Sequence, residues 1–286
     1  MKKIIALLLA AVLALAVFAS CGSSNKAQKV KVIDIALSEE SYAFAVSKED
    51  ATLLTKTNEF LKKIKDDGTF DQICNNYFGD GTPVKVASAK LDSSKDQLVV
   101  ATATGFEPFE MVDTDGKFYG IDMEIAAKLA EYLGKELVIQ DMEFASVVTS
   151  VQQKICDIGM AGLSITPARQ EVVNFSNSYY SANQVLIVKG DNTKFDSCKT
   201  AEDVVKILDT FDKSTKIGCQ TGTTGEIYIV GDASDPDGYG FKGTKCTKMG
   251  YTYVALAVTA MINGEIDYVI VDDAPAKAVT AKINAG

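Results

Sequence analysis

From residue 98 onwards, the sequence alternates buried strand patterns with helical patterns. The strand patterns occupy residues 98–105, 136–142, 157–162, 215–220 and 265–271, and the helical patterns lie within residues 117–134, 146–155, 201–211, 253–264 and 274–284. Parallel strands need a long crossover connection, usually a helix, so this order is typical of parallel βαβ units. The sequence therefore predicts an α/β protein of two lobes, joined at "QVLIVKG" (residues 184–190).

The composition is compatible with two such lobes and excludes several functions. Of the 286 residues, 47% are hydrophobic and 23% are charged, a normal globular balance. The net charge of −9 argues against a nucleic-acid partner, because the chain has no basic stripe to neutralise phosphates. The chain has no histidine, which excludes Ser-His-Asp and Cys-His catalysis and every zinc site with a histidine ligand.

The cysteines beyond residue 21 give no reason to expect a metal or a cofactor. They are scattered, without CxxC or metal-ligand spacing, at Cys74, Cys156, Cys198, Cys219 and Cys246. Two of them could pair in an exported protein, and their odd number would leave at least one free. Small buried residues that stay reduced are an equally open interpretation.

The first 20 residues are typical of a secretory signal. Lys2 and Lys3 precede an apolar run over residues 4–19, which is shorter than the roughly 18 to 20 residues that a membrane span needs. The junction "VFASC" resembles a bacterial lipobox, which makes Cys21 the expected first mature residue and lipid acceptor. Residues 21–28 would then be a polar tether, and the lipid would hold the protein on the extracellular face of the cell membrane or in the periplasm.

One arginine stands in a segment suited to binding anions. In "AGLSITPARQEVVNFSNSYY" (residues 161–180), Thr166 is an expected N-cap and Pro167 suits the first helical position. Arg169 falls in the first turn, where a cation opposes the helix dipole, so its presence there suggests a role beyond helix stability. A guanidinium beside a helix start can bind a carboxylate or phosphate. An ion pair with a surface acid is the alternative.

Two further loops could hold polar ligand groups. "QTGTTGEIY" (residues 220–228) is a glycine-bearing loop between a strand and a helix, without the Lys-Ser/Thr of a nucleotide-binding P-loop. "DYVIVDDAP" (residues 267–275) ends an apolar strand with Asp272 and Asp273, at the edge where α/β sheets place ligands. Asp273 could cap the next helix and leave Asp272 for a cation, although both acids could cap. Together the three loops offer groups for both charges of an amino acid.

The ordered motifs resemble a known family. "ATGFEPFE", "GIDMEIAAKLAEYLG", the arginine segment, "GTTGE" and "GEIDYVIVDDAPA" resemble extracellular amino-acid-binding proteins of ABC importers. The resemblance covers nearly all of residues 98–286 and implies the two-lobed type II periplasmic-binding-protein fold. In that family, segments like "YAFAV" and the closing helices "DGTFDQICNNYFG" stand at the end of the chain, whereas here they come first. The resemblance therefore implies a circular permutant whose ancestral termini are joined by residues 79–97. An unrelated N-terminal extension is the alternative.

The resemblance also implies the lobes and the residue roles. Lobe 2 is expected in residues 29–43 and 189–286 and lobe 1 in residues 44–188, with hinges near residues 43–47 and 186–189. Arg169 would bind the ligand carboxylate, helped by Ser164, Thr223 and Thr224. Asp272 would bind the ammonium group with the carbonyl of Gly162, and Ser164 could join them. Around the ligand side chain the resemblance places Phe106, Phe144 and Gln220.

The expected function is capture of a free amino acid by lobe closure and its delivery to an ABC permease, by a monomer. Members that bind cationic amino acids often carry an acid where this chain has Ala103, so a neutral polar or apolar ligand is favoured. An enzyme of the same fold, a dehydratase acting on a cyclic carboxylic acid, is the alternative. With no histidine, its general acid or base would have to be Glu107 or Glu143.

Overall fold

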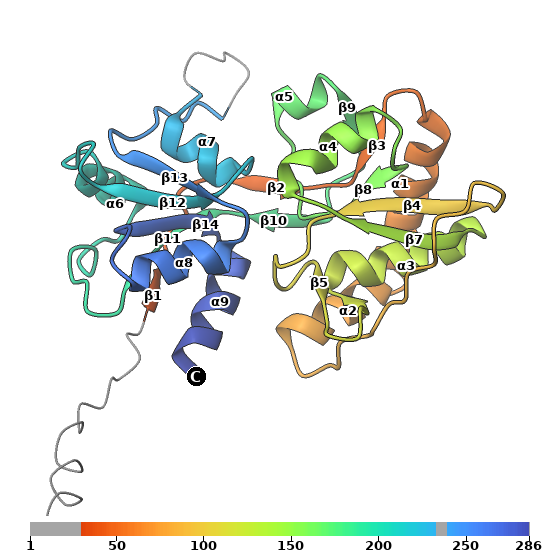
Figure 1. The fold of residues 1–286 in the computed structure, drawn as a ribbon, viewed down its shortest axis with the longest axis horizontal. Helices are drawn as coiled ribbons and strands as arrows, with labels where there is room; N and C mark the ends of the chain where they lie inside the picture. Colours follow the sequence, from red (N-terminus) through yellow and green to blue (C-terminus); the bar gives the residue numbers. More distant parts are fainter. Residues whose placement is uncertain (1–29, 233–238, 286) are drawn as a thin grey trace, which may run out of the picture.

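The computed structural model describes residues 30–232 and 239–285, which form the two lobes seen in Figure 1. The two five-stranded sheets confirm the prediction of two α/β lobes. The predictions for residues 1–29, which include the secretory signal, the lipid acceptor Cys21 and the tether, lie outside the described residues. No helix within the described ranges has the length and apolar character to cross a membrane.

The first lobe is built on a sheet with the strand order β7-β4-β8-β3-β9. Its strands are β3 (Ala45–Ser47), β4 (Gln97–Thr102), β7 (Glu136–Asp141), β8 (Ile158–Gly159) and β9 (Val173–Phe175). Because side chains alternate along a strand, Val100 of β4 joins the core with α1 (Ala51–Asp66) and α3 (Ile121–Leu133), while Val99 faces α4 (Phe144–Gln152). The smaller elements are α2 (Thr69–Phe78), β5 (Met111–Val112), β6 (Phe118–Tyr119) and α5 (Pro167–Gln170).

The second lobe is built on a sheet with the strand order β1-β11-β14-β12-β13. Its strands are β1 (Val30–Ile33), β11 (Gln184–Lys189), β12 (Lys216–Gln220), β13 (Thr247–Tyr251) and β14 (Tyr268–Asp272). Its helices are α6 (Ala201–Leu208), α7 (Thr224–Val230), α8 (Val254–Ile262) and α9 (Asp273–Ala285). Leu186 and Val188 pack with α6 and α7, and Val185 and Ile187 pack with α8, so β11 is buried on both faces.

The chain crosses between the lobes at β2 (Glu40–Tyr42) and β10 (Tyr180–Ala182), which pair antiparallel (Figure 1). The expected hinges were therefore wrong. Residues 45–47 pair with β8 and β9 and so belong to the first sheet. Residues 184–189 pair with β1 and β14 and so belong to the second sheet. The expected lobe boundary between residues 188 and 189 therefore falls inside β11. The apolar run over residues 184–189 predicts a buried strand, but such a run does not say which sheet the strand joins.

Residues 30–33 lie at the edge of the second sheet, where β1 pairs with β11 from Val30↔Lys189 to Ile33↔Leu186. The opposite end of the described chain lies beside them. Asn284, near the end of α9, accepts a hydrogen bond from the Val30 backbone and donates one back, at 3.2 and 2.9 Å. The segment that the resemblance assigns to the second lobe therefore lies in its sheet, next to the last helix.

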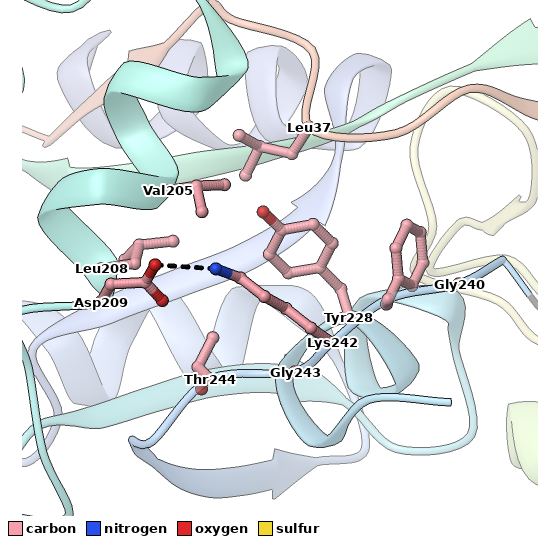
Figure 2. A pocket seen from close by; sticks show the side chains of 10 residues that line it. Leu37, Val205, Leu208, Asp209, Tyr228, Gly240, Lys242, Gly243 and Thr244 are labelled. Carbon is pink, nitrogen blue, oxygen red and sulfur yellow. Dashed lines mark hydrogen bonds and ion pairs between the residues drawn. The ribbon is translucent and has the colours of Figure 1, made fainter. Parts of the chain in front are cut away.

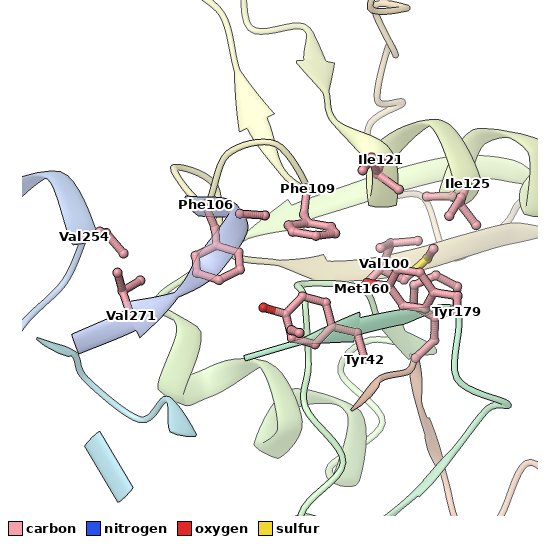
Figure 3. Packing of buried hydrophobic residues seen from close by; sticks show 14 of the residues in the cluster. Tyr42, Val100, Phe106, Phe109, Ile121, Ile125, Met160, Tyr179, Val254 and Val271 are labelled. Carbon is pink, nitrogen blue, oxygen red and sulfur yellow. The ribbon is translucent and has the colours of Figure 1, made fainter. Parts of the chain in front are cut away.

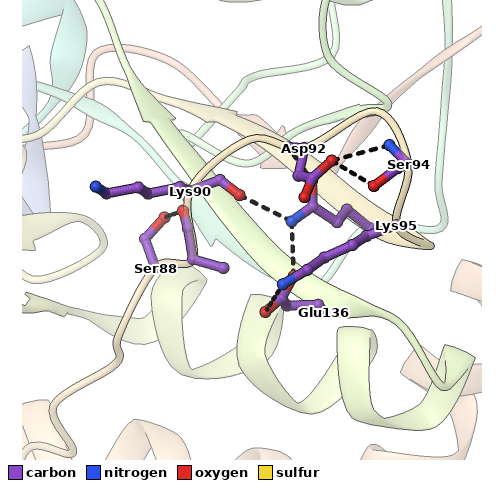
Figure 4. A network of polar contacts seen from close by, with 8 residues as sticks. Ser88, Lys90, Asp92, Ser94, Lys95 and Glu136 are labelled. Atoms are coloured by element: carbon purple, nitrogen blue, oxygen red, sulfur yellow. Dashed lines mark hydrogen bonds and ion pairs between the residues drawn. The ribbon is translucent and has the colours of Figure 1, made fainter.

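Residues 79–97, expected to be a surface linker, run along the first lobe and are attached to it at several points. Val86 forms an isolated bridge with Phe118 and is buried against Met123 and Ile139. Near its end, Gln97 donates to the carbonyl of Lys90 and to Glu136, which also pairs with Lys95 (Figure 4). The segment is thus a mostly exposed surface linker, as expected, that is attached to the lobe through buried Val86 and Gln97.

Candidate functional site

Arg169 lies at the site because its local sequence folds as predicted. Thr166 caps the short helix α5 by accepting the Arg169 backbone N–H at 3.2 Å, and Pro167 is the first helical residue. The guanidinium donates to the carbonyl of Ser164 at 2.6 Å and, across to the second lobe, to the carbonyl of Gly222 at 3.1 Å. Burial lowers the pKa of Arg169. Three of its five N–H groups are not used by these two bonds and could hold a carboxylate.

Arg169 is also the sole arginine in the sequence, and all other basic side chains are lysines. A lysine would supply a single charged point, whereas the planar guanidinium binds both oxygens of a carboxylate at once. Its Cζ atom lies 5.3 Å from the centre of the Phe144 ring, so the ring supports the plane of the guanidinium. The Phe144 ring therefore restrains one face of the Arg169 guanidinium in the absence of a ligand.

Asp272 approaches the same region from the second lobe. It is the last residue of β14 and only 3% exposed, and it accepts a hydrogen bond from the Tyr42 hydroxyl at 2.6 Å. Burial, followed by the nearby Glu40 carboxylate, raises the pKa of Asp272 to about 7. Such a carboxylate gains most from a cationic partner, because an ammonium group would offset both causes of the shift.

Glu40 is a site residue that the sequence analysis missed. It lies on the crossing strand β2, is 5% exposed, and its Oε2 accepts hydrogen bonds from Ser164 of the first lobe and Thr224 of the second, each at 2.6 Å. Its Oε1 accepts from Ser38 at 2.7 Å and Gln184 at 3.1 Å. No signal in the sequence separates Glu40 from the exposed Glu39 beside it. In the structure Glu40 shares a strand face with buried Tyr42, because residues i and i+2 of a strand point the same way.

The arrangement limits what two hydroxyl groups can offer to a ligand. Thr224 was expected to help bind the ligand carboxylate, and Ser164 to contact either the carboxylate or the ammonium group. Both hydroxyl groups donate to Glu40. Thr223 precedes α7 without a side-chain cap bond, because its hydroxyl donates to the carbonyl of Gln220 at 2.8 Å. Gln220 itself is buried, and its Oε1 has no hydrogen-bond partner within residues 30–232 and 239–285.

Gly162 and Phe106 form the base of the site in the first lobe. Gly162 has φ +54°, and a Cβ there would come within 2.9 Å of the Phe106 ring, so only glycine allows this approach. Its N–H donates to buried Asp122 at 2.9 Å, which also accepts from Tyr179. Burial raises the pKa of Asp122 to about 7. Asp122 thus fixes the Gly162 peptide, whose carbonyl the resemblance assigns to the ligand.

The two expected aromatic residues differ in their surroundings. Phe106 packs on Phe109 with ring centroids 6.0 Å apart and belongs to a core that continues across the lobes to Val254 and Val271 (Figure 3). Phe144 begins α4 and faces Arg169. Both are almost completely buried, and within the described ranges the structure records no ring contact between them.

The lobes touch around this cluster. The hydroxyl of Tyr239, in the second lobe, donates to the carbonyl of Ile165 at 2.7 Å, and Lys282 pairs with Glu107. Beside the Phe106 loop, a groove of about 420 Å³ is lined from both lobes, by Thr104 and Glu107 on one side and Tyr253, Leu256 and Lys282 on the other. Ala103 is buried and brings no charge to the site. Expected and newly found residues therefore form one cluster at the lobe boundary.

A separate cavity of about 200 Å³ lies inside the second lobe (Figure 2). It is lined by Leu37, Val205 and Tyr228 among others, and the ion pair of Lys242 with Asp209, at 2.7 Å, crosses its wall. None of the expected ligand residues lines it. We therefore place the candidate site at the lobe boundary.

The chain is similar to known proteins. Residues 98–229 match the family "Bacterial extracellular solute-binding proteins, family 3". The "Arginine-binding extracellular protein ArtP" of Bacillus subtilis (strain 168) is 32% identical over 151 residues, which is 53% of each chain, so the chain spans about half the length of this curated relative.

Solved structures extend the likeness to the fold. The holo ArgBP of T. maritima is 33% identical, with a TM-score of 0.53 over 65% of this chain and 74% of that one. The ancestral amino acid-binding protein AncCDT-1, described as a precursor of cyclohexadienyl dehydratase, is 29% identical, with a TM-score of 0.54 over 66% of this chain and 74% of its own. The described chain, with its two lobes and its arginine at their boundary, belongs to the family 3 bacterial extracellular solute-binding proteins.

Proposed function

We propose that the chain captures a free amino acid between its lobes and delivers it to an ABC permease. The observation that carries this proposal is the convergence of Arg169 from the first lobe and Asp272 from the second. Arg169 donates to the Ser164 carbonyl, Ser164 bridges to Tyr42, and Tyr42 donates to Asp272. A half-buried cation and a buried carboxylate linked in this way match the two charges of a zwitterion.

The mechanism we propose is a closing clamp. The lobes are joined by the short paired strands β2 and β10, and hinge closure commonly occurs about a few such residues. Contacts such as Arg169 with Gly222 and Tyr239 with Ile165 exist only when the lobes approach. A ligand that touches both lobes favours the closed form by its differential affinity, and the permease would recognise that form.

The side chain of the ligand is the open part of the proposal. The buried Ala103 favours a neutral polar or apolar amino acid, whereas ArtP of Bacillus subtilis (strain 168) is named as an arginine-binding protein. Glu107 and Glu143, which adjoin Phe106 and Phe144 in the sequence, do not decide between a neutral and a cationic ligand. Glu107 is paired with Lys282, and Glu143 is exposed. Glutamine and arginine are therefore the pair of ligands to compare first.

The test is native mass spectrometry of the purified protein followed by calorimetry with each amino acid. We expect one ligand per chain and an affinity that Arg169→Ala abolishes while the circular dichroism spectrum stays unchanged. Lys206→Ala, which removes an exposed lysine on α6, is the matched control and should bind like wild type. Micromolar affinity retained by Arg169→Ala would contradict the proposed site.

Anchoring, assembly and chain order remain part of the proposal. A lipid on Cys21 would attach the protein to the membrane, facing the extracellular space or the periplasm, and we propose that it acts as a monomer. We also propose that the chain is a circular permutant, supported by β1 in the second sheet and its contact with Asn284. The dehydratase alternative gains no support from Glu107, because Lys282 engages its carboxylate.

A further inference from the structure

Two residues of the crossing strand β2 hold polar groups of both lobes. Glu40 accepts four hydrogen bonds, from Ser164, Thr224, Ser38 and Gln184, at 2.6, 2.6, 2.7 and 3.1 Å. Tyr42, two residues further on the same face, donates to Asp272 Oδ1. Glu40, Tyr42, Ser164, Thr224 and Asp272 are all at most 5% exposed, so water does not compete strongly for these bonds.

The direction of these bonds decides what the hydroxyl groups can offer to a ligand. A hydroxyl has one proton and two lone pairs. The protons of Ser164 and Thr224 are both directed to Glu40 Oε2, and Thr224 also accepts from Gln184 at 3.1 Å. Towards a third partner, both oxygens can therefore only accept. A carboxylate placed there would meet lone pairs, whereas an ammonium group would find acceptors.

Asp272 completes the same acceptor surface. Its Oδ1 receives the Tyr42 proton, which leaves Oδ2 to accept from a ligand. On the other side of Ser164, the guanidinium of Arg169 donates to the Ser164 carbonyl and keeps N–H groups for a carboxylate. The cluster thus presents hydrogen-bond acceptors, positioned by β2, next to the guanidinium N–H donors of Arg169 in α5.

We propose that Glu40 is a positioning residue that makes Ser164 and Thr224 acceptors for the ammonium group of the ligand, so that the carboxylate is left to Arg169. This inference rests on the proposed amino-acid binding and assigns a role to a residue that the resemblance left without one. The competing view is that Glu40 only ties the lobes together. In that case its removal would weaken every ligand equally, with or without an ammonium group.

The test compares ligands that differ only in the ammonium group. The probes are L-arginine with 5-guanidinopentanoic acid, and L-glutamine with glutaramic acid, and the measured quantity is the ratio of affinities within each pair. We expect Glu40→Ala to lower this ratio about tenfold or more, because hydrogen bonds to charged groups have that weight. Glu40→Gln keeps an oxygen that both hydroxyls can reach, so it should retain more of the ratio than Glu40→Ala. Glu39→Ala, an exposed neighbour of the same type, should leave the ratio unchanged.

A second variant keeps the test decisive if Glu40→Ala does not fold, which circular dichroism would reveal. Ser164→Ala removes an acceptor for the ammonium group and should lower the same ratio. An equal loss for both members of a pair, in Glu40→Ala or in Ser164→Ala, would mean that the hydroxyl serves the carboxylate or that Glu40 acts only on stability, and the inference would be overturned. Wild-type protein that binds no amino acid would overturn the proposed function, and this inference with it.

Discussion

Val30 and Asn284, separated by 254 positions in the sequence, are joined by two hydrogen bonds between the edge strand β1 and the last helix α9. The two ends of the described chain thus meet in one lobe. Glu124 connects the end of α2 to the linker of residues 79–97. Its buried carboxylate accepts hydrogen bonds from Tyr77 of α2 and from Val84 of the linker, at 2.6 and 2.9 Å. A permuted chain would be expected to show this pattern.

The permutation predicts that the order of segments can be reversed. A chain that runs from residue 79 to residue 285 and continues through a short Gly/Ser linker into residues 30–78 should fold. It should bind the same amino acid within about threefold, because it keeps every described segment and moving the chain break changes the closure entropy only slightly. Urea unfolding and calorimetry measure both properties. The matched control is residues 79–285 alone, which lacks β1 and β3 and should not fold; a reordered chain that aggregates would count against the permutation.

A single arginine allows direct chemical labelling of the site. An arginine-selective dicarbonyl reagent should add once per chain, at Arg169, and bound amino acid should slow the reaction at least tenfold by occupying the guanidinium. Intact-mass spectrometry with peptide mapping gives the site and the rate. Arg169→Lys should take up no label. A labelling rate that ignores saturating ligand would show that the ligand does not contact this side chain.

Ligand binding should weaken as the pH falls below neutrality. The pKa of Asp272 is raised to about 7 by burial and by Glu40, and an ammonium partner would lower it in the complex. Below pH 7 the free protein must therefore release a proton to bind, and affinity should drop by up to about tenfold per pH unit. Tyr42 and Arg169 also face Asp272, but both keep their protonation state in this range.

Calorimetry at pH 6, in buffers with different ionisation enthalpies, should detect close to one proton released per ligand, and the number should approach zero at pH 8, where the ligand still keeps its ammonium group. Asp272→Asn should bind weakly and without this pH dependence. An affinity that is constant between pH 5 and pH 8 would rule out a titrating carboxylate in the site.

The buried carboxyl group of Glu110 leads us to expect a second pH effect, which concerns the unfolding free energy. Its carboxyl group is fully buried, neither oxygen has a partner in the described ranges, and burial raises its pKa well above the usual value. A raised folded-state pKa stabilises at low pH, and this contribution is lost as pH rises above the unfolded value near 4.3. Relative to wild type, Glu110→Gln should therefore gain unfolding free energy as pH rises from 5 to 8, by up to about 1.4 kcal/mol per pH unit.

Urea unfolding at four pH values checks this slope. The charges of Asp122 and Asp272 also raise the pKa of Glu110, so the difference between the two proteins reports Glu110 together with these neighbours. A difference between the two proteins that does not change with pH would mean that Glu110 does not bind an extra proton in the folded state.

The sequence was informative where function depends on local pattern. The Thr-Pro helix start that holds Arg169 and the position of Asp272 at a strand end follow from rules that act over a few residues. The alternation of strands and helices likewise predicted two α/β lobes, because periodicity reflects which face of each element is buried. The permuted chain order was implied by the resemblance to the family and not by periodicity, and it stays a prediction.

Tertiary structure alone decided which elements join which sheet and which hydroxyls are already engaged. An apolar run such as residues 184–189 is equally compatible with either sheet, and hydrogen-bonded pairing with β1 and β14 assigns it to the second. Glu40 stands beside Glu39 with the same chemistry, and only the crossing of β2 between the lobes buries one and exposes the other. The direction of a hydrogen bond depends on its partner, and here the partner lies far away in the sequence. No local pattern could therefore predict that Ser164 and Thr224 donate to Glu40.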